Sequence, residues 1–119
     1  MSDTVTIYHN PRCSKSRDTL SLLKSNGIEP QVVLYLQTPP DAATLGELLT
    51  MLGMTDAREL MRQKEDCYRS LNLADEHLSQ QELIQAMVEH PELIERPIVV
   101  NNGQARIGRP PEQVLDIVN

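Results

Sequence analysis

Cys13 is the residue of this sequence best placed to act as a nucleophile. It lies between a short β-branched segment followed by a proline and a segment with helical periodicity. At such a position, free backbone N–H groups and the helix dipole favour the thiolate. Arg12, Lys15 and Arg17 add positive charge without a neighbouring acid. These features predict a reactive cysteine with a lowered pKa; the alternative is a small buried residue at a strand-to-helix turn.

The residues after Cys13 restrict this chemistry. The motif Cys13-Ser14-Lys15-Ser16 ends in serine, so it lacks the second thiol of a redox CxxC motif. A tyrosine-phosphatase loop would need an arginine six residues after the cysteine, but that position is Thr19. The sequence therefore predicts a one-thiol cycle in which an external thiol resolves an intermediate on Cys13.

The distribution of basic residues predicts a small anion pocket. The chain has a formal net charge of −6, which argues against a general nucleic-acid binder. Residues 4–17 and 96–111 nevertheless contain no acid, and each segment carries three basic residues. Most of the basic residues are arginines, whose forked guanidinium suits the recognition of oxyanions. Ordinary surface charge is the alternative explanation.

Three arginines and one histidine are further candidates. Arg96 precedes Pro97, and a proline that opens a strand is tolerated at a sheet edge or with a cis peptide bond. Such a proline would direct Arg96 toward Cys13; the alternative is a trans proline and a solvated Arg96. Arg62 and Arg109, taken alone, fit surface arginines equally well. His9 could favour the thiolate or transfer a proton, or it could be a hydrogen-bonded histidine at the end of a strand.

Two other features of the sequence argue against further chemistry. Cys67 follows two acidic residues, a setting that raises the pKa of a thiol, so we expect it to be incidental. No spacing typical of metal ligands, such as CxxC or HExxH, occurs, and we expect no metal site.

The elements that position these residues follow from periodicity and turn signals. The predicted strands are residues 4–8, 31–36, 97–100 and 105–107, with a hairpin turn at 101–104. The predicted helices are residues 14–26 and 39–52, two short helices near 60–61 and 68–71, and one that follows a capping box at 79–82. A terminal helix is predicted to start at Pro110 and to bury Val114, Leu115, Ile117 and Val118. The order is βαβ, an all-helical middle, then ββα.

This order predicts an α/β fold of the thioredoxin-like (glutaredoxin-like) type. Its mixed four-stranded sheet would carry an all-helical insertion, about residues 40–95, between the second and third strands. No repeat, low-complexity tract or flexible linker interrupts the sequence, so residues 1–119 are predicted to form a single domain.

The same sequence features predict where the protein works. No apolar run approaches the roughly 20 residues of a membrane span, and no signal peptide is visible. Two cysteines in such a chain indicate a reducing compartment. We expect a soluble, cytoplasmic monomer that binds neither membrane nor nucleic acid.

Taken together, the motifs resemble the glutaredoxin-dependent arsenate reductase family (ArsC-like), and within it the YfgD-like bacterial branch. The likeness lies in residues 7–17, 34–36, 59–62, 96–100 and 108–110 and covers nearly the whole chain. Six positions match functional residues of the family: the nucleophile Cys13, His9 and Ser16 as supports of the thiolate, and Arg62, Arg96 and Arg109 as ligands of the oxyanion.

The resemblance implies a thioredoxin-like fold and an arsenate reductase. By this resemblance, the Cys13 thiolate attacks arsenate, glutathione displaces the product with reduction to arsenite, and glutaredoxin resolves the mixed disulfide. It implies glutathione as a co-substrate and no bound cofactor.

Two alternatives stay open at this point. An Spx-like regulator that binds RNA polymerase shares the fold, but it typically carries a CxxC switch and needs no complete set of three arginines. A glutathione-linked thiol-disulfide enzyme with another substrate is the third interpretation. The presence of Arg62, Arg96 and Arg109 favours the enzyme that acts on an oxyanion.

Overall fold

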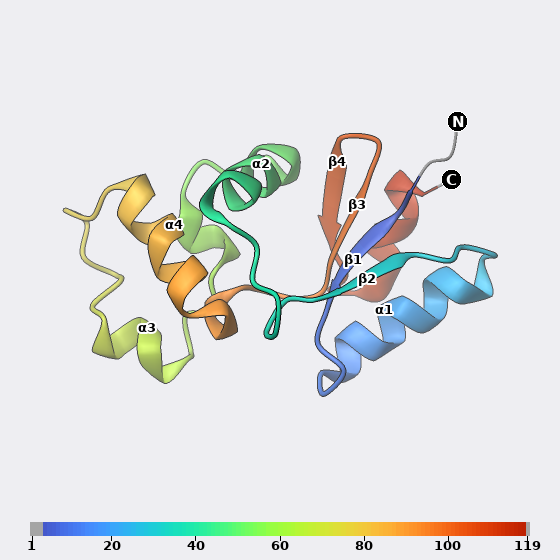
Figure 1. Ribbon diagram of the computed structural model, residues 1–119, viewed down its shortest axis with the longest axis horizontal. Helices are drawn as coiled ribbons and strands as arrows, with labels where there is room; N and C mark the ends of the chain where they lie inside the picture. The colour runs from blue at the N-terminus through green and yellow to red at the C-terminus, as the bar shows by residue number, and fades with distance from the viewer. Residues whose placement is uncertain (1–3, 119) are drawn as a thin grey trace. The chain divides into compact units, whose positions relative to one another are not determined.

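The computed structural model describes residues 4–118, which form two compact units (Figure 1). The first unit contains the described residues up to Thr38 and those from Arg96 onward, and the second is Pro39–Glu95. The second unit corresponds to the predicted insertion, since it lies between the second and third strands of the chain. No helix within the described residues is long and apolar enough to cross a membrane.

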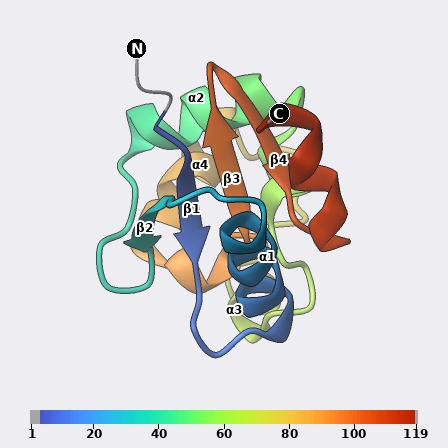
Figure 2. The same cartoon turned by 90° about the vertical axis from the view of Figure 1, so that its right-hand side faces the viewer.

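The first unit is built on a mixed four-stranded sheet in the order β2-β1-β3-β4, which Figure 2 shows side by side. Strand β1 (Thr6–His9) pairs in parallel with β2 (Gln31–Leu34) and antiparallel with β3 (Ile98–Asn101), which pairs antiparallel with β4 (Gln104–Ile107). The predicted topology is confirmed.

The strand bounds differ from the prediction for local reasons. The second strand ends at Leu34 because the chain turns there: the carbonyl of Leu34 accepts hydrogen bonds from the N–H groups of Gln37 and Thr38, each at 2.9 Å. The hairpin between β3 and β4 turns at Asn102 (φ 53°) and Gly103 (φ 74°). Positive φ at both central residues is the geometry that favours Asn-Gly, so the predicted turn is confirmed.

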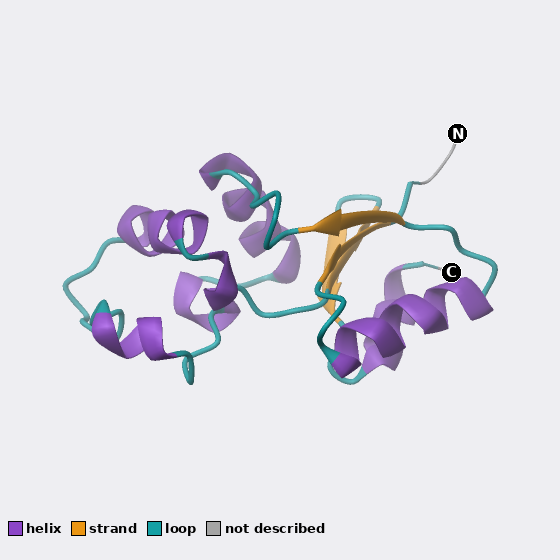
Figure 3. Ribbon diagram, turned by 60° about the horizontal axis from the view of Figure 1, so that its bottom comes forward, coloured by secondary structure: helices purple, strands orange, loops and turns teal. Residues whose placement is uncertain are grey.

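Helix α1 (Ser14–Ser25) and the C-terminal 3₁₀ helix η3 (Pro111–Ile117) lie on the same side of the sheet (Figure 3). The core that they form with the sheet consists of Val5, Ile7, Leu23, Val99, Val114 and Ile117. The predicted burial of Leu115 and Val118 is wrong, because both are only half-buried. A 3₁₀ helix has three residues per turn, so Val114 and Ile117 share the inward side and Leu115 does not.

Gly108 allows a close approach between α1 and the end of β4. A Cβ atom there would overlap Oγ1 of Thr19 and lie 2.9 Å from Cγ of Pro97. Thr19 is fully buried, and its hydroxyl donates to the carbonyl of Lys15 at 2.8 Å. The N–H of Gly108 donates to the carbonyl of Pro97 at 3.0 Å. The first turns of α1, the residue before β3 and the residue after β4 therefore meet at Gly108.

The second unit consists of short, well-capped helices. They are α2 (Ala42–Leu52), η1 (Ala57–Leu60), α3 (Asp66–Ser70), α4 (Gln80–Glu89) and η2 (Pro91–Leu93). The predicted capping box of Ser79 and Glu82 is present, and Gly53 ends α2 with a φ of 74°. Within this unit, an isolated antiparallel bridge joins Met61 to Ile94.

Gly108→Ala should lower the free energy of unfolding by about 1–3 kcal/mol, because the added methyl group forces Thr19 or Pro97 to move. Gly46→Ala is the matched control. No atom lies within 4 Å of a Cβ built at Gly46, inside α2, so this change should stabilise by about 0.5–1 kcal/mol. Urea unfolding of both variants measures the difference, and a neutral Gly108→Ala would contradict the close approach.

Candidate active site

Cys13 is the N-cap residue of α1, and its backbone is fixed from both sides. It has extended dihedral angles (φ −96°, ψ 124°). Its N–H donates to the carbonyl of Asn10 at 3.0 Å, and its carbonyl accepts from the N–H of Arg17 at 3.0 Å. The side chain is a half-buried free thiol, and the first turn of α1 contains no acid. The sulfur therefore occupies the place where a capping oxygen normally meets the unpaired N–H groups of a helix.

The surroundings of Cys13 act on its pKa in opposite directions. Partial burial raises the pKa of the thiol, because it removes water from the thiolate. The backbone N–H of Ser16, the charge of Arg96, the N–H of Lys15 and the charge of Arg109 lower it, in that order. The lowering contributions together exceed the effect of burial, so the pKa of Cys13 lies below its ordinary value, as the sequence predicts.

His9 and Ser16 form a buried pair that joins β1 to the first turn of α1. Nδ1 of His9 lies 2.6 Å from Oγ of Ser16, and Oγ accepts the N–H of Asn10 at 3.0 Å. Burial lowers the pKa of His9, and the charges of Arg17 and Lys24 lower it further. A neutral imidazole that carries its proton on Nε2 can accept a hydrogen bond from the Ser16 hydroxyl at Nδ1. His9 thus holds Ser16, the residue whose backbone N–H favours the Cys13 thiolate.

Two of the three predicted arginines lie in the first unit and act electrostatically on Cys13. The charges of Arg96 and Arg109 both lower the pKa of the thiol. Nη1 of Arg109 donates to the backbone carbonyl of Arg96 at 3.3 Å, so the two residues are neighbours. The Arg96–Pro97 peptide bond, which the sequence left open, is cis, and so is the Arg109–Pro110 bond. Arg96 precedes β3 and Arg109 follows β4, and the charges of both act on the residue that begins α1.

Arg62 belongs to the second unit and has a partner that the sequence analysis missed. Its Nη1 lies 2.6 Å from Oε2 of Glu65 in a half-buried ion pair. Its backbone N–H donates to the carbonyl of Leu93 at 2.7 Å, beside the Met61–Ile94 bridge. Arg62 and Glu65 are the ends of a four-residue turn in which the N–H of Glu65 donates to the carbonyl of Arg62 at 3.1 Å, and their opposite charges are the signal that could have predicted this pair.

Cys67 also lies in the second unit, in surroundings opposite to those of Cys13. Burial raises the pKa of its thiol, and the carboxylates of Glu92 and Glu65 raise it further. The predicted direction is therefore confirmed. Among residues 4–118, no three His, Cys, Asp or Glu side chains gather where they could hold a metal ion.

The sequence analysis also missed Thr19 and Gly108 as positioning residues. The contact between them brings the segment that contains Arg109 against α1. Because Gly108 also lies against Pro97, the segment that contains Arg96 is held at the same place. The glycine before Arg109-Pro110 was the available signal, because a glycine next to a candidate site residue often permits a close backbone approach.

Comparison with known proteins places this chain in a family. The ArsC family model matches residues 8–117. The chain belongs to the ArsC family. It is 73% identical to the uncharacterized protein YfgD of Escherichia coli K12, with 99% of each chain covered. It is 53% identical to an arsenate reductase of Haemophilus influenzae, with 97% of this chain and 99% of the relative covered.

A solved structure confirms the fold of this ArsC-family chain. The arsenate reductase from Vibrio cholerae is 58% identical, has a TM-score of 0.96, and aligns over 99% of this chain and 100% of that one. The predicted α/β, thioredoxin-like architecture of this arsenate reductase-like protein is thus established.

The two thiols should differ in reactivity in the direction of their surroundings. Each thiol is studied alone: Cys13 in a Cys67→Ser variant and Cys67 in a Cys13→Ser variant. Alkylation by iodoacetamide should reach half of its maximal rate at a lower pH for Cys13 than for Cys67. The rates are followed by mass spectrometry across a pH series. In urea, where the surroundings are lost, the two midpoints should coincide, whereas a reversed order in the folded protein would contradict the site described above.

Proposed function

We propose that this protein reduces arsenate to arsenite through a covalent adduct on Cys13, with glutathione and glutaredoxin as cytoplasmic reductants. The observation that carries the proposal is the convergence of two arginines and two helix N–H groups on one thiol. A thiolate in this setting is a nucleophile, and the cations beside it attract an oxyanion. The relatives named arsenate reductase support arsenate as that oxyanion.

In this proposal, Arg96 and Arg109 bind arsenate beside Cys13, and Arg62 is assigned as a third ligand of the oxyanion. A tetrahedral oxyanion presents several oxygens, and a guanidinium group can bind two of them at once. The Arg62 assignment rests on the resemblance of its motif to the family. The ion pair with Glu65 engages Nη1 of a side chain that has five N–H donors.

The chemical steps balance with a single protein thiol. The Cys13 thiolate attacks As(V) and forms an S–As bond. One arsenate oxygen is displaced and, once protonated, leaves as water. The glutathione thiolate then attacks the Cys13 sulfur, and the electron pair of the S–As bond stays on arsenic, which becomes As(III). The two sulfurs are oxidised to a mixed disulfide, and the dithiol of glutaredoxin returns Cys13 to its thiol. Ser16 and His9 support the thiolate at the beginning and end of the cycle.

A coupled assay tests the proposed function directly. Wild-type protein with glutathione and glutaredoxin should form arsenite from arsenate, and Cys13→Ser should form none. If glutathione disulfide is produced from another disulfide substrate while no arsenite appears, the thiol chemistry stands and arsenate is excluded as its substrate.

Arg96→Lys and Arg109→Lys should each lower kcat/KM for arsenate about 30- to 1000-fold. This corresponds to the loss of about 2–4 kcal/mol of transition-state stabilisation from a bidentate contact. Alkylation of Cys13 should change little, because lysine keeps the charge that favours the thiolate. Arg106→Lys is the matched control, since Arg106 lies in the same acid-free segment and donates to the adjacent carbonyl of Ala105. Equal effects at all three positions would contradict the proposed roles.

A further inference from the structure

A groove of about 670 Å³ runs along one side of α1, and of its lining residues only His9 belongs to the His9–Ser16 pair and the arginines described above. It is lined by His9, Pro11, Arg17, Leu20 and Lys24, together with two serines. Arg17 and Lys24 supply two positive charges, and no carboxylate is among the lining residues. We call this cavity the α1 groove.

The α1 groove extends along α1 from Pro11, two residues before Cys13, to Ser25 at the end of the helix. Arg17, Leu20 and Lys24 follow the N-cap Cys13 by four, seven and eleven residues, a spacing that places them on one side of a helix. Side chains on a helix lean toward its N-terminus, which here is the end that carries Cys13. The guanidinium of Arg17 is held at that end, because its Nη1 donates to the carbonyl of Pro11 at 3.0 Å.

The arginines proposed to bind the oxyanion approach Cys13 from another side of the same helix. Thr19, which contacts Gly108 next to Arg109, lies about 130° around the helix axis from the row of Arg17, Leu20 and Lys24, at 100° per residue. A ligand in the α1 groove and an oxyanion on Arg96 and Arg109 would therefore flank the sulfur from different sides.

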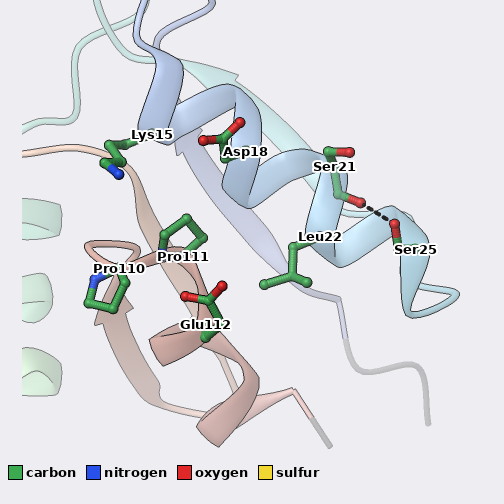
Figure 4. Close-up of a pocket in the computed structure, with 8 residues that line it drawn as sticks. All are labelled: Lys15, Asp18, Ser21, Leu22, Ser25, Pro110, Pro111 and Glu112. Atoms are coloured by element: carbon green, nitrogen blue, oxygen red, sulfur yellow. Dashed lines mark hydrogen bonds between the residues drawn. The ribbon is translucent and has the colours of Figure 1, made fainter.

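A second groove on α1 has the opposite character (Figure 4). It lies between α1 and the start of η3, and its volume is about 480 Å³. Asp18 and Glu112 line it together with Lys15, so its lining has more acidic than basic residues. Of these two grooves, the α1 groove is the one whose charge suits a ligand with carboxylates.

We propose that the α1 groove binds glutathione through its carboxylates and presents the glutathione thiol to Cys13. The proposal rests on the proposed function, in which a small thiol must reach the sulfur while arsenic is attached to it. Glutathione carries two carboxylates, which suit Arg17 and Lys24, and its backbone can lie along Pro11 and Leu20.

The position of the groove also suits the direction of the redox step. Displacement at a sulfur atom requires the attacking thiolate to approach opposite the leaving group. From the α1 groove, the glutathione sulfur forms the S–S bond with Cys13 on one side. The electron pair of the S–As bond stays on arsenic, and arsenite leaves on the other side of the sulfur, where Arg96 and Arg109 lie. The thiol proton of glutathione ends on an arsenite oxygen.

Binding can be measured without turnover by titrating wild-type protein with S-methylglutathione and following backbone amide shifts by NMR. The largest shifts should fall on Arg17, Leu20 and Lys24. Lys24→Gln should raise the dissociation constant about threefold, and Lys24→Gln with Arg17→Gln about tenfold, as expected for partly exposed charge pairs. Arg69→Gln is the matched control, because it removes an exposed arginine of the second unit, whose Nη2 lies 3.9 Å from Oδ1 of Asp66. This change should leave the dissociation constant unaltered.

Kinetics separate the groove from the oxyanion site. Lys24→Gln should raise KM for glutathione about threefold, and the rise should be smaller for arsenate and for β-mercaptoethanol, a thiol that lacks carboxylates. Shifts centred on Lys15, Asp18 and Glu112, or equal binding by Lys24→Gln, would overturn the proposal. If wild-type protein forms no arsenite, the proposed function fails, and the titration alone then decides the α1 groove.

Discussion

The contact of Gly108 with Thr19 and Pro97 is the constraint on which the geometry around Cys13 depends. A glycine at this position lets the residue after β4 lie directly against the second turn of α1. The next residue is Arg109, and Pro97 follows Arg96, so one close approach positions two cations that flank separate strands. Any larger side chain would push α1 away from the arginines, although it would leave the pairing of the strands intact.

The chemistry of Cys13 depends on a balance between burial and preorganised positive charge. A buried thiol is unreactive, and an exposed one has no means of holding an anion. Here the sulfur is half-buried at the N-cap of α1, and the buried His9–Ser16 pair holds the turn whose N–H groups meet it. The first unit therefore contains Cys13, its electrostatic support and the two arginines proposed to bind the oxyanion, whereas Arg62 lies in the second unit and is paired there with Glu65.

Local signals in the sequence were sufficient for much of the fold. The capping box at Ser79 and the Asn102–Gly103 turn depend on neighbouring residues, so composition predicts them well. The 3₁₀ geometry of η3 and the role of Gly108 depend on contacts between distant segments, and sequence patterns could not predict them. Of the candidate site, the lowered pKa of Cys13 was predictable from charge and spacing, but the hydrogen bond between His9 and Ser16 required the fold.

In the proposed cycle, Cys13 is the only protein thiol that takes part in arsenate reduction, and its partner is an external thiol. Intact-protein mass spectrometry after reaction with arsenate and glutathione, without glutaredoxin, tests it most directly. We expect one glutathionyl group on Cys13 for each arsenite released, and no modification when arsenate is left out. A disulfide between Cys13 and Cys67, or glutathionylation that does not depend on arsenate, would contradict it.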